Sequence, residues 1–108
     1  MPNVTLFVTS AGMPKQAALK AFTAECTQLC TGVLKAALDK VHIIYASVQH
    51  GRGHPAYVEI KYRLETFRPP EVMNAFMEAL DDSLVKNTGL KARIRCFGYA
   101  ATDIQARN

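Results

Sequence analysis

The chain has 108 residues, of which 49% are hydrophobic and 20% charged, and its formal net charge is +4. This length and composition predict one packed domain spanning residues 1–108 and exclude a disordered chain. No apolar run approaches the roughly 18 residues of a membrane span, and the start of the chain lacks the apolar core of a signal peptide. We therefore expect a cytoplasmic protein with no membrane partner.

The positive charge excess does not follow a nucleic-acid-binding pattern. Basic residues are scattered, with no long run and no zinc-finger spacing, so we expect no nucleic-acid partner and assign the excess to a small anionic substrate. The cysteines, Cys26, Cys30 and Cys96, are odd in number and form no C-x-x-C motif. They predict free thiols, buried in a reducing compartment, rather than a metal site.

The first half of the chain predicts a strand, a helix and a strand. Residues 3–8 alternate polar and apolar side chains, which favours a strand. Pro14 suits the first position of a helix, and apolar residues then recur at helical spacing as far as Thr31-Gly32, a helix stop. Residues 41–48 are rich in β-branched and aromatic side chains and predict the second strand.

The second half repeats this order after a loop at residues 49–55, which contains two glycines and a proline. Residues 56–64 alternate strictly and predict a third strand. Pro69-Pro70-Glu71 favours a helix start, Lys86 would lie in the last turn, and Gly89 would end the helix. Residues 92–97 predict the fourth strand, followed by a polar tail from Gly98.

Two consecutive β-α-β units therefore make up the chain, as pseudo-repeats at about 2–48 and 56–98. Ala21-Phe22 recurs as Ala75-Phe76, and Thr31-Gly32 recurs as Thr88-Gly89. Right-handed crossovers place both helices on one face of a four-stranded sheet, which is an α+β fold. Because the chain has no third layer, we expect other subunits to cover the bare face.

Met1-Pro2 at the start of a β-α-β unit, followed by a second unit, resembles the tautomerase superfamily. That superfamily includes 4-oxalocrotonate tautomerase, macrophage migration inhibitory factor, malonate semialdehyde decarboxylase and cis-3-chloroacrylic acid dehalogenase, and the resemblance covers the whole chain. It implies a homotrimer whose sheets form a central barrel, no cofactor, and catalysis by the amine of Pro2.

Physical chemistry supports a catalytic Pro2 independently. Methionine before a small residue is usually removed, which would leave a free secondary amine. Burial and nearby cations would lower the pKa of this amine toward neutrality, where a general base works best at a carbonyl compound. The alternative is that Pro2 only begins an edge strand.

Three arginines are candidates for substrate contacts. Arg68 precedes the second helix, and the resemblance implies that it binds a substrate carboxylate; the alternative is a solvated arginine at the helix entry. Arg93 and Arg95 would share one side of the fourth strand, with Ile94 and Cys96 on the helix side. The resemblance places Arg93 near an arginine that polarises the substrate. Arg95 is a further candidate for substrate binding, because two arginines on a face without helices would line either a pocket or a subunit interface.

His42 and Asp39 complete the candidate site. His42 occupies the place in the first unit that corresponds to Arg93, although a packed histidine is the preferred interpretation. Asp39 is close to the position of the catalytic aspartate of malonate semialdehyde decarboxylase, whereas a turn residue is the alternative. The Arg-Pro-Arg stretch of that decarboxylase is incomplete here, because Thr66-Phe67-Arg68 keeps only the second arginine.

The resulting hypothesis is a tautomerase that moves a proton in a small 2-oxo or enol carboxylic acid. Pro2 would be the base and acid, Arg68 would hold the carboxylate and Arg93 would polarise the carbonyl oxygen. The alternatives are decarboxylation of a 3-oxo acid assisted by Asp39, and a non-enzymatic, cytokine-like trimer. Dehalogenation is disfavoured because no water-activating glutamate can be placed.

Overall fold

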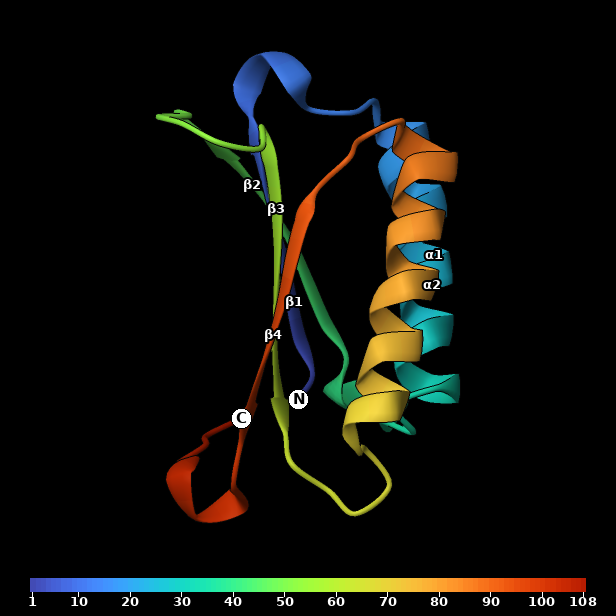
Figure 1. Ribbon diagram of the computed structural model, residues 1–108, viewed down its shortest axis with the longest axis vertical. Helices are drawn as coiled ribbons and strands as arrows, with labels where there is room; N and C mark the ends of the chain where they lie inside the picture. Colours follow the sequence, from blue (N-terminus) through green and yellow to red (C-terminus); the bar gives the residue numbers. More distant parts are fainter.

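The computed structural model describes all 108 residues and contains two long helices packed on one face of a sheet (Figure 1). Three short 3₁₀ turns accompany these elements, at Ser10–Gly12, Leu38–Lys40 and Ala101–Asp103. The main elements in chain order are β1 Asn3–Thr9, α1 Gln16–Gly32, β2 His42–Val48, β3 Ala56–Arg63, α2 Pro70–Thr88 and β4 Arg93–Tyr99.

The four strands form one sheet in the order β2-β1-β3-β4. Each β-α-β unit supplies a parallel pair, β1 with β2 and β3 with β4, and the two units meet through the antiparallel pair of β1 and β3. The predicted α+β fold with both helices on one face is therefore confirmed. The strands that begin the two units lie at the centre of the sheet.

The core lies between the sheet and the helices. Strand alternation sends one face of β1 and β3 entirely inward, and both helices turn an apolar stripe toward it. Burying each large side chain contributes about 1.5–3 kcal/mol. The central members of this core are Val4, Leu6, Val8, Val58 and Ile60 of the sheet, Phe22 and Cys26 of α1, and Phe76, Leu80 and Leu84 of α2.

The opposite face of the sheet has no covering layer and carries both aromatic and charged side chains. Phe7 and Tyr57 stack there with ring centroids 5.9 Å apart. Glu59 accepts a hydrogen bond from the Tyr57 hydroxyl at 3.2 Å and forms an ion pair with Lys61 at 3.3 Å. Phe97 is 43% exposed on the same face. The aromatic residues lie where the alternation predicts, but Glu59 and Arg95 lie between the stacked pair and Phe97.

The start of α1 differs from the prediction, whereas its end agrees with it. The helix begins at Gln16 rather than Pro14, because Lys15 keeps an extended conformation as the N-cap. Gly32 is the last helical residue, as predicted, but it does not adopt the left-handed conformation of a glycine cap. The chain reverses at Lys35, whose φ is 56°, where the Ala36 N–H donates to the Cys30 carbonyl oxygen at 3.0 Å. Gly89, by contrast, caps α2 in the left-handed conformation, as predicted.

β4 is longer than predicted and the polar tail starts later. The strand runs to Tyr99, whose carbonyl oxygen accepts a hydrogen bond from the Leu64 N–H at 2.8 Å. Gly98 is part of the strand, and a Cβ atom there would lie 2.6 Å from the Leu64 side chain. A glycine at this position therefore lets Leu64 pack across β4.

All three cysteines are free, and two of them are buried as predicted. Cys26 and Cys30 are buried free thiols, and Cys96 is a half-buried free thiol. Neither helix is both long and apolar enough to cross a membrane.

Candidate functional site

A hollow of about 550 Å³ surrounds the start of the chain. Its walls come from the turn before β2, the end of β3 and the residues after β4, and both termini lie at this end of the sheet (Figure 1). The residues that line it are Met1, Asn3, Asp39, Lys40, Val41, His42, Arg63 and residues 104–108. Charged and polar side chains therefore converge on the chain start.

Pro2 is buried between Met1 and Asn3, which both line this hollow. Its carbonyl oxygen accepts a hydrogen bond from the His42 N–H at 3.1 Å, which continues the pairing of β1 with β2. Because β1 is a central strand, the interpretation of Pro2 as the start of an edge strand is wrong. Met1 is half-buried and lines the hollow, so its removal would open Pro2 to this space.

The electrostatic environment favours a neutral amine at the chain start. Burial lowers the pKa of the Met1 α-amino group, and the positive charges of Arg63, Lys40 and Arg68 lower it further, in that order. The Asp39 carboxylate acts in the opposite direction. An amine with a lowered pKa is less protonated near neutral pH, which is the state that a general base requires.

The structure brings Asp39 and His42 to the same hollow. Asp39 lies in the 3₁₀ turn Leu38–Lys40 and is exposed. His42 is the first residue of β2 and is also exposed, so its interpretation as a packed histidine is wrong. The reason is the strand alternation, which turns Ile43 toward the helices and His42 away from them.

Arg68 is buried rather than solvated at the helix entry, with 7% of its surface exposed. Its Nε donates to the Leu34 carbonyl oxygen and its Nη1 to the Arg63 carbonyl oxygen, both at 2.8 Å. The guanidinium carbon lies 5.1 Å from the centre of the Phe67 ring. Arg68 thus connects the turn after α1 to the end of β3, while the binding of a substrate carboxylate stays a prediction.

Arg93 and Arg95 lie on the uncovered face of β4, and Ile94 and Cys96 pack toward the core, as the alternation predicts. Arg93 is level with Tyr57 of β3 and Arg95 with Glu59.

Within one chain, Arg93 and Arg95 lie too far along the sheet to contact Pro2. Asn3, which follows Pro2, is level with Lys61 of β3. At ~3.3 Å per residue, Arg95 lies about 10 Å and Arg93 about 17 Å farther along the sheet than Pro2. They line a separate hollow of about 510 Å³, together with Arg52, Gly53, His54, Tyr57 and Phe97.

Arg63 and Lys40 were missing from the sequence-based candidates. Alternation along β3 already puts Arg63 on the same side as Tyr57 and Lys61. The sequence pattern does not reveal, however, that the end of β3 lies beside the start of β1, because this depends on the antiparallel pairing of distant strands. Lys40 follows Asp39 directly and could have been considered with it.

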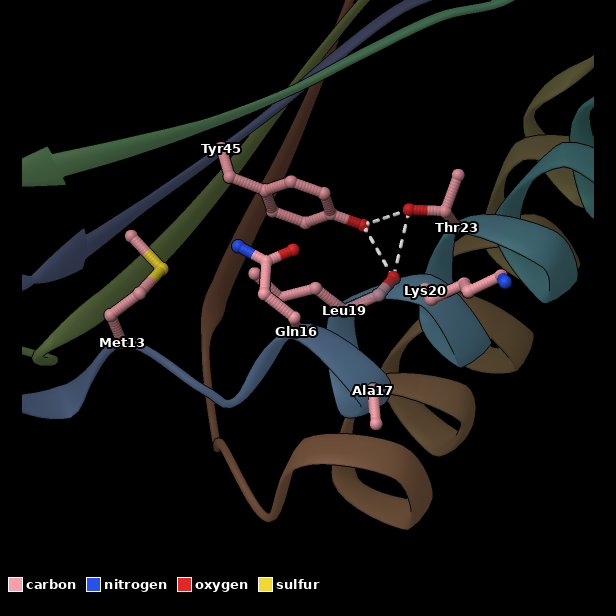
Figure 2. Close-up of a pocket in the computed structure, with 7 residues that line it drawn as sticks. All are labelled: Met13, Gln16, Ala17, Leu19, Lys20, Thr23 and Tyr45. Carbon is pink, nitrogen blue, oxygen red and sulfur yellow. Dashed lines mark hydrogen bonds between the residues drawn. The ribbon is translucent and has the colours of Figure 1, made fainter.

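A third hollow, of about 500 Å³, lies at the beginning of α1 (Figure 2). Its polar centre is a contact between the Tyr45 hydroxyl and Thr23 Oγ1 at 2.6 Å, and both hydroxyls lie within hydrogen-bond distance of the Leu19 carbonyl oxygen. Burial raises the pKa of Tyr45, which keeps the phenol neutral. These groups satisfy one another and connect β2 to α1. Nowhere in the chain do three or more His, Cys, Asp or Glu side chains form a group that could hold a metal ion.

Comparison with known proteins identifies the fold. No protein-family model and no curated protein matches the sequence. A fused 4-OT protein, solved as a symmetric trimer, shares 20% identity over 98% of this chain and 94% of its own, with a TM-score of 0.79. A protein solved after inactivation by 2-oxo-3-pentynoate shares 16% identity over 96% and 90%, with a TM-score of 0.74.

Malonate semialdehyde decarboxylase is a third match, with 11% identity over 99% of this chain and 92% of its own and a TM-score of 0.69. The TM-scores indicate a common fold, and identities this low indicate nothing beyond it. The chain therefore has the fold of the tautomerase superfamily.

Proposed function

We propose that this protein is an enzyme that moves a proton between carbon and oxygen in a small 2-oxo or enol carboxylic acid. Its catalytic group is the secondary amine of Pro2, set free by removal of Met1. The observation that carries the proposal is the position of the chain start, in a hollow where burial and the charges of Arg63, Lys40 and Arg68 lower the pKa of an amine. The fold shared with tautomerase-superfamily enzymes supports it.

The chemistry follows from this arrangement. The neutral Pro2 amine removes a proton from the substrate, and negative charge moves onto the carbonyl oxygen as the enolate forms. Arg63 and Lys40 stabilise this charge, because cations in a partly desolvated site act more strongly than in water. The protonated amine then returns the proton to the other position. In this mechanism the exposed Arg63 takes the carboxylate contact that was predicted for Arg68.

Arg68 has a supporting role in this proposal. Its two bonds to carbonyl oxygens hold the wall of the site together, and its charge helps to keep the amine neutral. A direct contact with the substrate carboxylate would have to use its remaining N–H groups.

We also propose that the active assembly is a homotrimer. The uncovered sheet face carries half-exposed apolar residues, Ile44 and Phe97 among them, and a structural neighbour was solved as a symmetric trimer. Arg93 and Arg95 can then take part in the reaction only from a neighbouring subunit. Sedimentation should give about three times the mass of one chain, and a stable monomer at micromolar concentration would contradict this assembly.

The central experiment combines mass spectrometry with an activity assay. The purified protein should lack Met1 and should convert the enol of phenylpyruvate or 2-hydroxymuconate to the keto form. 2-Oxo-3-pentynoate, which inactivates one structural neighbour, should label the Pro2 amine by conjugate addition and abolish turnover. Full activity in protein that retains Met1, or a label elsewhere with Pro2 unmodified, would refute the mechanism.

Decarboxylation of a 3-oxo acid is a second candidate, favoured by the position of Asp39 in the hollow. Its carboxylate raises the pKa of the amine, which supports the cationic form that serves as an electron sink. Release of carbon dioxide from malonate semialdehyde distinguishes this reaction from tautomerisation. A trimer that catalyses neither reaction would match the non-enzymatic alternative.

A further inference from the structure

The chain after β4 turns back and forms part of the wall of the hollow around the chain start. The 3₁₀ turn Ala101–Asp103 redirects it, with hydrogen bonds from the Asp103 and Ile104 N–H groups to the Ala100 and Ala101 carbonyl oxygens at 2.9 and 3.2 Å. Ile104 is half-buried, whereas residues 105–108 are exposed. The segment is thus anchored at Ile104 and lines the hollow with all five of its residues.

Arg107 is the only charged side chain in residues 104–108, and it joins Lys40 and Arg63 in the same hollow. The single carboxylate side chain that lines this space is that of Asp39. The ion pairs of the chain are Lys61–Glu59, Lys86–Glu25 and Lys91–Asp81, so all four of these charges lack an ionic partner. The side chains of the hollow therefore supply three positive charges and one negative charge.

The three cations reach the hollow from different segments: Lys40 from the turn before β2, Arg63 from the end of β3 and Arg107 from the chain after β4. Arg63 and Lys40 act on the amine of the chain start, whereas Arg107 is not among the charges with the strongest effect on it. A planar guanidinium with free N–H groups is well suited to bind a carboxylate through two hydrogen bonds.

We propose that Arg107 is a specificity-determining residue that binds an anionic group of the substrate remote from the reacting carbonyl. The site then prefers a dianionic ligand over a monoanionic one of the same length. This inference rests on the proposed function, because that function places the reacting end of the substrate beside Pro2.

The test measures binding directly, by titration calorimetry at low salt, with adipate and monomethyl adipate as probes. The unmodified protein should bind adipate about tenfold more tightly than the monoester. Arg107→Gln should reduce that ratio to about twofold, mainly through weaker binding of adipate, and Arg107→Lys should restore part of it. Lys15→Gln removes the same charge at the opposite end of the sheet, next to α1, and should keep the original ratio.

An unchanged ratio in Arg107→Gln would overturn the proposal, as would equal losses for adipate and the monoester. Equal weakening by Lys15→Gln and Arg107→Gln would also overturn it, because only net charge would then matter. These outcomes are independent of turnover. The proposed function itself fails if Pro2→Ala retains full tautomerase activity, whatever the calorimetry gives.

Discussion

The two ends of the sheet each carry a cationic hollow, and they differ in what accompanies the positive charge. At the start of β1, Arg63 and Lys40 surround the amine of the chain start and the carboxylate of Asp39. At the far end, Arg93 and Arg95 are accompanied by Arg52, a histidine and aromatic rings. Only the first hollow combines an amine of lowered pKa with charges that act on it. For this reason the proposed active site is the first hollow, where positive charge lies close to a candidate base.

Replacing Pro2, the proposed base of the first hollow, should have the largest effect on activity. Pro2→Ala should lower kcat for an enol acid by about 10²-fold, the scale of general acid–base catalysis, because the primary amine of alanine replaces a more basic secondary amine in a rigid ring. Thermal unfolding should change little, since proline is tolerated but not required before a strand. Mass spectrometry must first show that both proteins lack Met1. Equal turnover would remove Pro2 from the mechanism.

The next largest effect should be a loss of stability when Arg68 is replaced. This substitution tests whether the wall of the first hollow depends on Arg68. Arg68→Ala should lower the free energy of unfolding by about 2–4 kcal/mol, because the carbonyl oxygens of Leu34 and Arg63 lose their buried donor. Urea denaturation measures this loss. Arg63→Ala is the matched control; its exposed side chain should affect stability by less than about 0.5 kcal/mol. Similar stability for the two variants would contradict the structural role of Arg68.

Arg63→Gln should weaken substrate binding in the first hollow without unfolding the protein. We expect KM for a carboxylate substrate to rise about tenfold, with a much smaller change for its ester. Removal of this cation should raise the pKa of the Pro2 amine, because Arg63 lowers the pKa of the α-amino group of Met1 at the same end of the chain. The acidic limb of the kcat/KM profile should therefore move to higher pH. A limb that stays in place would show that Arg63 does not act on the base.

Asp39→Asn should have a smaller effect on the pKa of the amine than Arg63→Gln, and of opposite sign. The carboxylate raises the pKa of the amine, so its neutralisation should move the acidic limb to lower pH. Asp103→Asn removes a carboxylate that does not line the hollow and should leave the profile unchanged. A shift to higher pH in Asp39→Asn would exclude the proposed electrostatic coupling.

Arg93→Gln should have the smallest effect on the pKa of the base. Because Arg93 lies about 17 Å farther along the sheet than Pro2, the acidic limb should keep its position even if a neighbouring subunit uses this arginine to polarise the substrate and kcat falls. The pH profile of kcat/KM checks this. A clear shift of the limb would place Arg93 near a Pro2 amine and end the distinction between the two hollows.

The local patterns of the sequence determined most of the fold. Alternation identified which side chains of β1, β3 and β4 face the helices, including Ile94 and Cys96 against Arg93 and Arg95. Helical spacing and the cap at Gly89 likewise defined α2. Such signals are reliable because they arise between residues two to four positions apart, where the backbone geometry sets the neighbours. Gly32 also marked the end of α1, although glycine permits a left-handed conformation without requiring it, and Lys35 adopts that conformation instead.

The tertiary structure alone decided which distant residues share the candidate site. Antiparallel pairing of β1 with β3 brings Arg63 to the chain start, and the turn after β4 brings Arg107 to the same hollow. Five positions after Arg63, Arg68 is buried because the turn after α1 offers it the Leu34 carbonyl oxygen. Strand register and chain reversal depend on packing between segments far apart in sequence, so no local pattern encodes them.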